Sequence, residues 1–237
     1  MILLLGGTRD AIKIGEQLTQ PYIYSIAGVT DNPATPKNAQ VRIGGFSEQN
    51  DSINGLKNYI IKNNITKIIN ATHPYASNIT NTVNIVSQEL DIETIRYIRK
   101  EWQKNNDDDW INCKDSNEIK QKLANIKGNV FFTLGAKSMG DYNDLNCYVI
   151  ARTVKKIPIN NGECLVDKGP YSINNEQLLF DKYNFQALVC KNSGGDMNYN
   201  KIAVAIKRKI PIFMLDRPQD NSKNILEIMP NNSFMLT

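Results

Sequence analysis

The sequence predicts an α/β protein made of two Rossmann-like, doubly wound domains with mainly parallel sheets and an interdomain cleft. Two observations lead to this fold class. Short apolar runs alternate with amphipathic stretches along the 237 residues, which is the pattern of βαβ units. In both halves of the chain a strand, a glycine turn and a helix follow one another, so each half is expected to form its own sheet.

The first half contains three strand–helix pairs. An apolar strand at 2–5 is followed by glycines and by a helix at about 10–18, whose apolar residues share one face at helical spacing. Pro74 fits the first turn of a later helix, because proline is tolerated where its missing N–H is not needed. The remaining elements expected here are a strand at 22–27, a helix at 51–63, a strand at 67–70 and a helix from Pro74 to about 90.

The second half repeats this alternation after a polar stretch at 104–110, which we interpret as a linker or exposed turn. We therefore expect an N-terminal domain at 1–108 and a C-terminal domain at 109–237. An exchange of strands between the two sheets stays open. The elements expected in this half are a helix at 115–125, a strand at 130–134, a short helix after Gly135, a strand at 187–190, a helix at about 198–208 and a strand at 212–215.

Composition and charge narrow the class of protein. The net charge of +4 suits an acidic small molecule and does not demand nucleic acid or a membrane surface. The four cysteines form no Cys-x-x-Cys pair and the chain has one histidine, so no metal site is expected and the cysteines are interpreted as reduced core residues. The N-terminus resembles no signal peptide, and no apolar run is long enough to span a bilayer. We expect a soluble, cytoplasmic protein.

A glycine turn at Gly6–Ala11 joins the first strand to the first helix. Glycines at this place let backbone N–H groups approach a pyrophosphate, and the helix N-terminus favours negative charge. The segment departs from Gly-x-Gly-x-x-Gly at its second and third glycines, so a merely structural turn remains an alternative. Asp31 follows the second strand. It is placed either to accept a hydrogen bond from a ribose 2′-hydroxyl or to stabilise a turn or cap a helix.

The segment Ala71–Ala76 follows a strand at the edge where ligands bind in open α/β sheets. His73 is interpreted either as a substrate-binding or proton-donating residue or as a loop histidine that caps its helix. A second glycine turn, at Lys191–Gly195, is suited to a phosphate or a carboxylate. Basic residues recur near the expected strand ends, where they suit carboxylates or simply face solvent: Arg96, Arg99, Lys100, Lys137, Arg152, Lys191, Lys201 and Arg217.

Several enzyme classes are excluded. Ser193 lacks the Gly-x-Ser-x-Gly setting of a hydrolase nucleophile, and a second histidine for a triad does not exist. The chain contains neither a phosphate-loop motif nor the Tyr-x-x-x-Lys pair of short-chain dehydrogenases. From the residues alone, the protein is predicted to bind a nucleotide and an acidic partner.

At this point the chain resembles the precorrin-6A reductase family over nearly its whole length. The Thr-His-Pro-Tyr-Ala block at 72–76 and the Lys-x-Ser-Gly-Gly block at 191–195 are the most specific matches. Val29 and Asn192 depart from the family pattern, where arginine and aspartate are common. The other matching segments, in order, are 2–11, 27–28 with Thr30, 42–46, 97–100 with Trp102, 132–137, 151–152, 169–172, Lys201 and 217–218.

The resemblance implies hydride transfer from NADPH or NADH to one C=C bond of the precorrin-6A or cobalt-precorrin-6A macrocycle, giving precorrin-6B in cobalamin (vitamin B12) biosynthesis. The tetrapyrrole carries many carboxylates, which would explain the distributed basic residues. The implied partners are this tetrapyrrole, no nucleic acid and no membrane. The expected protein is a monomer or weak dimer with transient contacts to other corrin-pathway enzymes. The alternatives are another NAD(P)-dependent oxidoreductase on a small substrate and a non-catalytic nucleotide sensor.

The expected site residues fall into three groups. His73 and Tyr75 are expected to be catalytic. Cofactor binding is expected at Gly6, Gly7, Thr8, Arg9, Asp10, Gly28, Thr30, Gly45, Thr72, Gly135 and Lys137. Substrate binding is expected at Arg99, Arg152, Tyr171, Ser172, Lys191, Ser193, Gly194, Gly195, Lys201 and Arg217.

Overall fold

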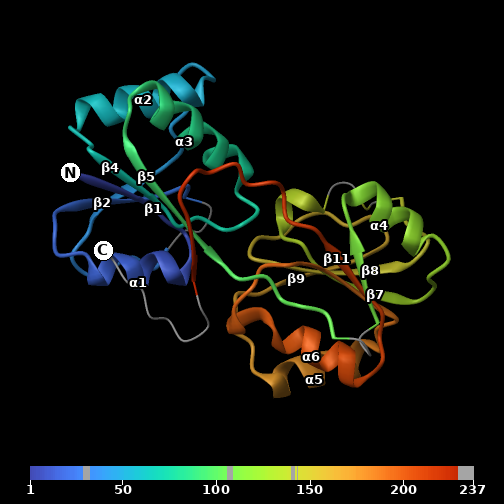
Figure 1. Ribbon diagram of the computed structural model, residues 1–237. Helices are drawn as coiled ribbons and strands as arrows, with labels where there is room; N and C mark the ends of the chain where they lie inside the picture. The colour runs from blue at the N-terminus through green and yellow to red at the C-terminus, as the bar shows by residue number, and fades with distance from the viewer. Residues whose placement is uncertain (29–32, 106–108, 140–141, 143, 229–237) are drawn as a thin grey trace. The chain divides into compact units, whose positions relative to one another are not determined.

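The computed structural model describes residues 1–28, 33–105, 109–139, 142 and 144–228. The chain divides into two compact units, each built around its own sheet (Figure 1). Unit 1 comprises Met1–Lys100 and the chain from Pro218 onward, and unit 2 comprises Glu101–Arg217.

Unit 1 contains a six-stranded sheet in the order β12-β5-β4-β1-β2-β3, in which all neighbouring strands are parallel. Two layers of helices cover its faces (Figure 1). The strands are β1 (Ile2–Leu5), β2 (Tyr22–Ile26), β3 (Gln40–Ile43), β4 (Lys67–Asn70), β5 (Glu93–Arg99) and β12 (Ile225–Ile228). The helices are α1 (Arg9–Gln17), α2 (Ser52–Lys62) and α3 (Ser77–Glu89).

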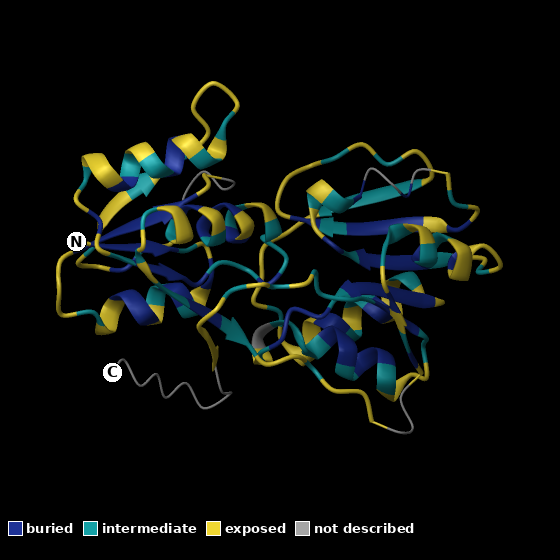
Figure 2. Cartoon of the chain, turned by 45° about the horizontal axis from the view of Figure 1, so that its top comes forward, coloured by how far each residue is buried: buried dark blue, intermediate teal, exposed yellow. Residues whose placement is uncertain are grey.

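The alternation of side chains along β1 explains why this sheet is covered on both faces. Leu4 packs with Ile14 of α1 in one buried cluster. Leu3 and Leu5 point to the other face and pack with Leu56 of α2. Successive residues of a strand face opposite ways, so a strand that is apolar throughout needs a helix layer on each side. Figure 2 shows the central strands as buried throughout.

Unit 2 contains a second six-stranded parallel sheet, in the order β6-β11-β10-β7-β8-β9. Helix α4 packs on one face, with Ile119 in its core, and α5 and α6 pack on the other, with Phe180 and Ile202. The strands are β6 (Trp110–Cys113), β7 (Asn129–Thr133), β8 (Tyr148–Thr153), β9 (Gly162–Val166), β10 (Ala187–Lys191) and β11 (Ile212–Leu215). The helices are α4 (Ser116–Leu123), η1 (Ala136–Ser138), α5 (Ile173–Tyr183), η3 (Asp196–Asn198) and α6 (Asn200–Lys207).

Both sheets have the 3-2-1-4-5-6 strand order found in dinucleotide-binding α/β folds. In unit 1 the sixth position is taken by β12, from the end of the chain, which pairs with β5. In unit 2 it is taken by β6, which follows unit 1 directly in the sequence and pairs with β11. The exchange of strands left open by the sequence is therefore present.

The prediction of two Rossmann-like, mainly parallel α/β units is confirmed. The unit boundaries differ from the expected ranges 1–108 and 109–237, because β12 completes the first sheet rather than the second. The helix expected to begin at Pro74 begins at Ser77, since Pro74 lies in a turn. Trp110, assigned to the linker, is the first residue of β6.

Among the described residues, no helix is long and apolar enough to cross a membrane. The four cysteines are free thiols, and three of them, Cys113, Cys147 and Cys190, are buried. Burial raises the pKa of the Cys113 thiol to about 11 and that of Cys190 to about 12, and it raises the pKa of Cys147 as well.

We expect a thiol reagent at pH 8 to modify Cys164 first in the native protein. Only the thiolate reacts, and a pKa raised by two units leaves about 100-fold less thiolate at a given pH. Mass spectrometry after a timed iodoacetamide pulse measures the order of labelling, and denaturant should make all four cysteines react. Equal labelling of Cys164 and Cys113 in the folded protein would contradict the burial described here.

Candidate functional site

The predicted site residues of unit 1 gather at one edge of its sheet. Parallel strands end at the same edge, so the segments that follow β1, β2, β3, β4 and β5 lie together there. The strand order reverses between β1 and β4, which is where ligands bind in open α/β sheets. Thr30, and Asp31 beside it, lie outside the described residues. The predicted residues at this edge are Gly6, Gly7, Thr8, Arg9, Asp10, Gly28, Gly45, Thr72, His73, Tyr75 and Arg99.

The turn after β1 is shaped by Tyr24 of β2. A Cβ at Gly6 would lie 2.3 Å from the Tyr24 ring, so only glycine fits here. The Tyr24 hydroxyl accepts a hydrogen bond from the Gly7 backbone N–H at 3.1 Å. Gly7 has a φ of 96°, and a Cβ built on it would meet nothing within 4 Å. The backbone of Gly7 therefore lies open on its outer side, which leaves room for a phosphate group to approach.

The expected role of Gly6 in cofactor binding is tested by Gly6→Ala, which should weaken dinucleotide binding by about 10- to 100-fold, or about 1.4–2.8 kcal/mol. The new methyl group must displace the Tyr24 ring, which is fully buried and cannot swing aside, or the backbone of the turn. Fluorescence titration with NADPH and NADH measures the change. Gly128→Ala is the control: its φ is also positive, at 88°, but its Cβ would meet only the flexible Gln186 side chain in unit 2. Equal loss of binding in both variants would contradict the role of this turn.

Thr8 and Asp10 fix the start of α1. The Thr8 hydroxyl accepts from Ala11 N at 3.1 Å as the helix cap, and it donates to the Ala71 carbonyl at 2.9 Å. Thr8 therefore joins the turn after β1 to the loop after β4. Asp10, in the first turn of α1, forms an ion pair with Arg99 at the end of β5. Arg9 is exposed at the same helix end. The structure thus brings the predicted cofactor residue Asp10 together with the predicted substrate residue Arg99.

The loop after β4 is held from beneath by Asn70. The Asn70 side-chain oxygen accepts from the backbone N–H of Thr72 at 3.2 Å and from its hydroxyl at 2.8 Å. Its amide nitrogen donates to the Thr80 hydroxyl of α3 at 3.1 Å. Asn70 is buried, so these bonds fix the loop at the end of the strand without competition from water.

His73 and Tyr75 lie next to each other in this loop. Their ring centroids are 5.7 Å apart, and both residues are half-buried. The Tyr75 backbone N–H donates to His73 Nδ1 at 3.3 Å. A nitrogen that accepts carries no proton in the neutral ring, so the neutral imidazole carries its proton on Nε2. The loop therefore presents His73 as a donor through Nε2.

Arg42 organises the turns that follow β2 and β3. Its guanidinium donates to the carbonyls of Gly44 and Gly45, both at 2.6 Å, and lies 3.9 Å from the Phe46 ring centroid. Burial lowers the pKa of Arg42. Gly28 has a φ of 71° and is exposed at the end of β2. A cation thus lies near the end of β2, where the adenosine ribose of a dinucleotide is expected.

The predicted substrate residues of unit 2 gather at the corresponding edge of the second sheet, around the turn after β10. Asn192 accepts from the backbone N–H of Trp102 at 2.9 Å and donates to its carbonyl at 3.1 Å. The Trp102 indole N–H donates to the Gly195 carbonyl at 2.8 Å. Ser193 is buried, and Gly194 and Gly195 have positive φ angles of 68° and 71°. The turn is thus rigidly held by its own side chains and by Trp102.

Three basic side chains surround this turn. Lys191 Nζ lies 3.0 Å from the Ser138 hydroxyl, and Lys201 Nζ donates to the Asn198 carbonyl at 2.7 Å and lies 5.6 Å from the Trp102 ring. Burial lowers the pKa of both lysines. Arg217 donates to the Asn192 carbonyl at 2.7 Å and pairs with Glu101 at 3.4 Å. Lysine and arginine side chains of this kind bind carboxylates through charge-assisted hydrogen bonds.

Arg152, Tyr171 and Ser172 have structural partners of their own. Arg152 forms a bidentate ion pair with Glu176 of α5, at 2.7 and 3.2 Å, and lies 3.6 Å from the Tyr171 ring centroid. Desolvation raises the pKa of Tyr171 to about 12. Ser172 caps α5 by accepting from Asn175 N at 3.2 Å. Arg152 therefore carries a charge that Glu176 already balances.

Gly135 and Lys137 follow β7 in unit 2 and are both exposed. Their predicted role was cofactor binding, but they lie on the second sheet, whereas the glycine turn at Gly6 lies on the first. Within the described part of the chain, no group of three His, Cys, Asp or Glu side chains is arranged to hold a metal ion.

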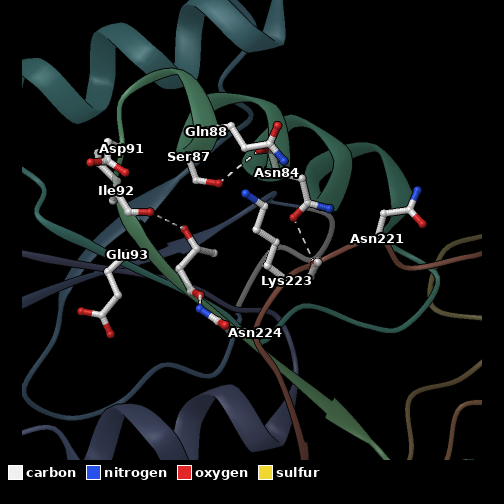
Figure 3. Close-up of a pocket in the computed structure, with 11 residues that line it drawn as sticks. Asn84, Ser87, Gln88, Asp91, Ile92, Glu93, Asn221, Lys223 and Asn224 are labelled. Carbon is white, nitrogen blue, oxygen red and sulfur yellow. Dashed lines mark hydrogen bonds between the residues drawn. The ribbon is translucent and has the colours of Figure 1, made fainter.

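A cavity of about 530 Å³ lies in unit 1 (Figure 3). It is lined by the second half of α3, by the turn into β5 and by the residues that precede β12, including Asn84, Glu93 and Lys223. These segments belong to the edge where β5 and β12 begin, whereas the predicted site lies where the strands end. The cavity contains none of the predicted site residues.

Sequence reasoning missed Tyr24, Asn70 and Glu176, which position the predicted residues. The sequence did contain a signal for Asn70. An asparagine at the end of an apolar strand is a polar residue where burial is expected, and this indicates a structural or functional role. Tyr24 and Glu176 gave no such signal, since one resembles an ordinary strand aromatic residue and the other an ordinary helix-surface carboxylate.

Comparison with known proteins identifies similar chains over nearly the full length. The family model described as precorrin-6x reductase CbiJ/CobK matches residues 1–231. A precorrin-6A reductase from Sinorhizobium sp is 30% identical over 226 residues, which cover 91% of this chain and 84% of that protein. A cobalt-precorrin-6A reductase from Methanocaldococcus jannaschii is 28% identical over 230 residues, covering 92% and 90%. A solved structure, CobK precorrin-6A reductase, has a TM-score of 0.83 at 23% identity and covers 94% of this chain and 91% of that one.

Proposed function

The chain belongs to the precorrin-6x reductase CbiJ/CobK family, and on this premise we propose that it reduces one C=C bond of precorrin-6A, or of its cobalt-bearing counterpart, with hydride from NADPH or NADH. It is an oxidoreductase of cobalamin biosynthesis. The observation that carries the proposal is the gathering of the glycine turn and the His73 loop at the switch point of unit 1's sheet.

The residues of unit 1 fit a dinucleotide. The open space at Gly7 lets a diphosphate approach the backbone, and the N-terminus of α1 favours its negative charge. We assign diphosphate binding to Gly6, Gly7 and Thr8, and the ribose end to Gly28 and Gly45. When bound, the nicotinamide supplies the hydride. The chain's own contribution is orientation, an effect that can be worth about 7–11 kcal/mol when the reacting atoms are well placed.

We propose NADPH as the preferred cofactor, because the Arg42 guanidinium lies near the end of β2, where an arginine accommodates a 2′-phosphate in this type of fold. Arg42→Lys keeps the positive charge but loses the two bonds to the Gly44 and Gly45 carbonyls. The ratio of KM for NADH to KM for NADPH is the readout. It should fall in this variant, and an unchanged ratio would contradict the assignment.

The proposed substrate-binding residues lie in unit 2. Lys191, Lys201 and Arg217 surround the turn Ser193–Gly195, whose glycines have positive φ angles. Side-chain carboxylates of a tetrapyrrole would add negative charge beside the buried Lys201 and the half-buried Lys191. Arg99 and Arg152 already balance Asp10 and Glu176, so we assign them to holding the site together rather than to direct contact with substrate.

Hydride addition to one carbon leaves negative charge on the conjugated system, and a proton must reach the adjacent carbon. We propose that His73 supplies it as the imidazolium, which gives up its Nε2 proton to the carbon and becomes neutral. The hydrogen bond from Tyr75 N to Nδ1 belongs to the neutral ring. Tyr75 supports this orientation through its backbone and lies beside the imidazole ring.

The proposed reaction is tested by anaerobic incubation of the purified protein with precorrin-6A and with cobalt-precorrin-6A, each with NADPH and with NADH, while cofactor absorbance is followed. Oxidation of the cofactor in at least one arm is expected, and the four arms also give the substrate and cofactor preference. No oxidation in any arm would contradict the proposal.

We further propose a cytoplasmic enzyme that works as a monomer or weak dimer. The free thiols of all four cysteines suit a reducing compartment. Sedimentation at several protein concentrations tests the oligomeric state.

A further inference from the structure

The segment Asp220–Asn224, which leads into β12, returns from unit 2 to unit 1 and makes side-chain contacts there. The backbone carbonyl of Asn224 accepts from Arg96 N of β5 at 2.8 Å. The Ser222 hydroxyl lies 3.1 Å from the Asn84 side-chain oxygen of α3. Figure 3 shows the Asn84 side chain pointing from α3 toward the returning segment beside Lys223. The returning segment thus contacts both the sheet and the helix that follow the His73 loop.

Arg96 connects this segment to the loop after β4. Its side chain is fully buried. Through Nη1 it donates to the backbone carbonyls of Asn70, Thr72 and Tyr97, each at 3.0 Å. The Thr72 carbonyl belongs to the peptide bond that leads into His73. The Arg96 guanidinium therefore fixes the position of the backbone that carries the His73 side chain.

Asp220 provides the negative charge that this buried guanidinium needs. Arg96 Nε donates to Asp220 at 2.8 Å. Asp220 is itself held by Ser222, which donates to it through the hydroxyl at 2.6 Å and through the backbone N–H at 3.1 Å. A continuous series of hydrogen bonds therefore runs from Ser222 through Asp220 and Arg96 to the Thr72 carbonyl.

Stability alone is a poor reason to keep such a pair. Burying a guanidinium is costly, and apolar residues of similar volume often stabilise a protein as well or better. Arg96 Nη2 is also buried without an acceptor among the residues that the structure describes, which adds to the cost. An arginine is nevertheless the side chain that can reach two loop carbonyls and a carboxylate at once, because its donors form a rigid planar fork.

We infer that Arg96 and Asp220 are positioning residues of the reductase site, through which the returning segment sets the place of the His73 loop. The inference rests on the proposed role of that loop in the reaction. Neither residue needs to touch the substrate or the nicotinamide. Their effect is on the geometry of proton transfer, while the glycine turn that binds the dinucleotide lies after a different strand.

Asp220→Asn, Arg96→Lys and Ser222→Ala test this inference in the full-length protein, with kcat, nicotinamide Kd and melting temperature measured for each. Asp220→Asn should lower kcat by about 100-fold, the effect of a displacement of about 1 Å, with Kd for the nicotinamide cofactor unchanged. Arg96→Lys keeps the positive charge but loses the planar set of guanidinium donors, so its kcat should also fall. Ser222→Ala removes only a supporting bond and should fold normally, with a loss of about two- to tenfold.

Glu93→Gln is the matched control. Glu93 pairs with Lys67 at 2.8 Å and so joins the same two strands, β5 and β4, at their opposite ends. It should leave kcat unchanged. The inference would be overturned if Asp220→Asn had the kcat of the wild type. It would also be overturned if kcat fell in step with the melting temperature in Glu93→Gln as well as in the three test variants.

Hydrogen exchange of the backbone amides at 72–76 separates this inference from the proposed function. Exchange should be at least tenfold faster in Asp220→Asn than in the wild type, and unchanged in Glu93→Gln. If the wild type shows no turnover, the proposed function fails, and the exchange result alone decides whether Asp220 fixes the loop. Unchanged exchange in Asp220→Asn would show that it does not.

Discussion

Replacing His73 with alanine should lower kcat by about 100-fold or more, in the range of 10²–10⁴ that a positioned proton donor contributes. The imidazolium would supply its proton through Nε2 and become neutral, and alanine has no group to take its place. Nicotinamide affinity should not change, because the glycine turn and Tyr24 are untouched. Anaerobic steady-state kinetics, with cofactor Kd measured separately, gives both quantities. Added imidazole should restore part of the lost rate.

Tyr75→Phe is the comparison variant for this prediction. It removes the hydroxyl but keeps the backbone N–H that holds His73 Nδ1 and the ring beside it. Its kcat should stay within about threefold of the wild type, less than the contribution of one charged hydrogen bond. If the large loss appeared in Tyr75→Phe instead, the proton donor would be Tyr75. A rise in KM alone in His73→Ala would indicate substrate binding rather than acid catalysis.

Glu176→Gln should destabilise the protein by about 3–5 kcal/mol, because it leaves the buried Arg152 guanidinium without its carboxylate. The side chains of Arg152 and Glu176 are only 8% and 2% exposed, so water cannot replace the lost partner. For a chain of this length the melting temperature should fall by roughly 6–20 °C. Thermal unfolding followed by circular dichroism measures the change.

Glu89→Gln provides the control for this second prediction. The Lys57–Glu89 pair has a similar distance, 2.9 Å, but its side chains are 35% and 44% exposed. Such surface pairs contribute about 0–1 kcal/mol, so the control should melt close to the wild type. The double variant Arg152→Met with Glu176→Leu should recover much of the lost stability, since it removes both charges. Equal melting temperatures for Glu176→Gln and Glu89→Gln would contradict the importance of burial.

The sequence predicted the gathering of the candidate residues of unit 1 at one sheet edge better than it predicted the side chains that hold them. Gly6 and His73 are 67 residues apart, yet both follow apolar strands that were recognised, and parallel strands end at one edge. Asn70 and Tyr24 were missed, because their roles depend on contacts across the sheet that no local pattern reveals. Local periodicity predicts elements, whereas side-chain partners follow from packing.

The unit boundaries also depend on contacts that local sequence patterns do not reveal. No strand was expected at 225–228, yet β12 forms there and pairs with β5 rather than with its nearer neighbours in sequence. Pro74 was expected inside a helix because proline is common in a first turn, but the loop held by Asn70 extends to Ala76 and delays α3 to Ser77. In both cases a tertiary contact decided between conformations that the local sequence allowed.

The central claim is direct hydride transfer from the nicotinamide to the macrocycle, and isotope tracing tests it most directly. The measurement is the mass spectrum of the product formed anaerobically in ordinary water with NADPH or NADH that carries deuterium at C4 on the transferred face. The account predicts a reduced macrocycle that contains one deuterium, with one cofactor oxidised per product. A reduced product without deuterium, or cofactor bound but never oxidised when substrate is present, would contradict it.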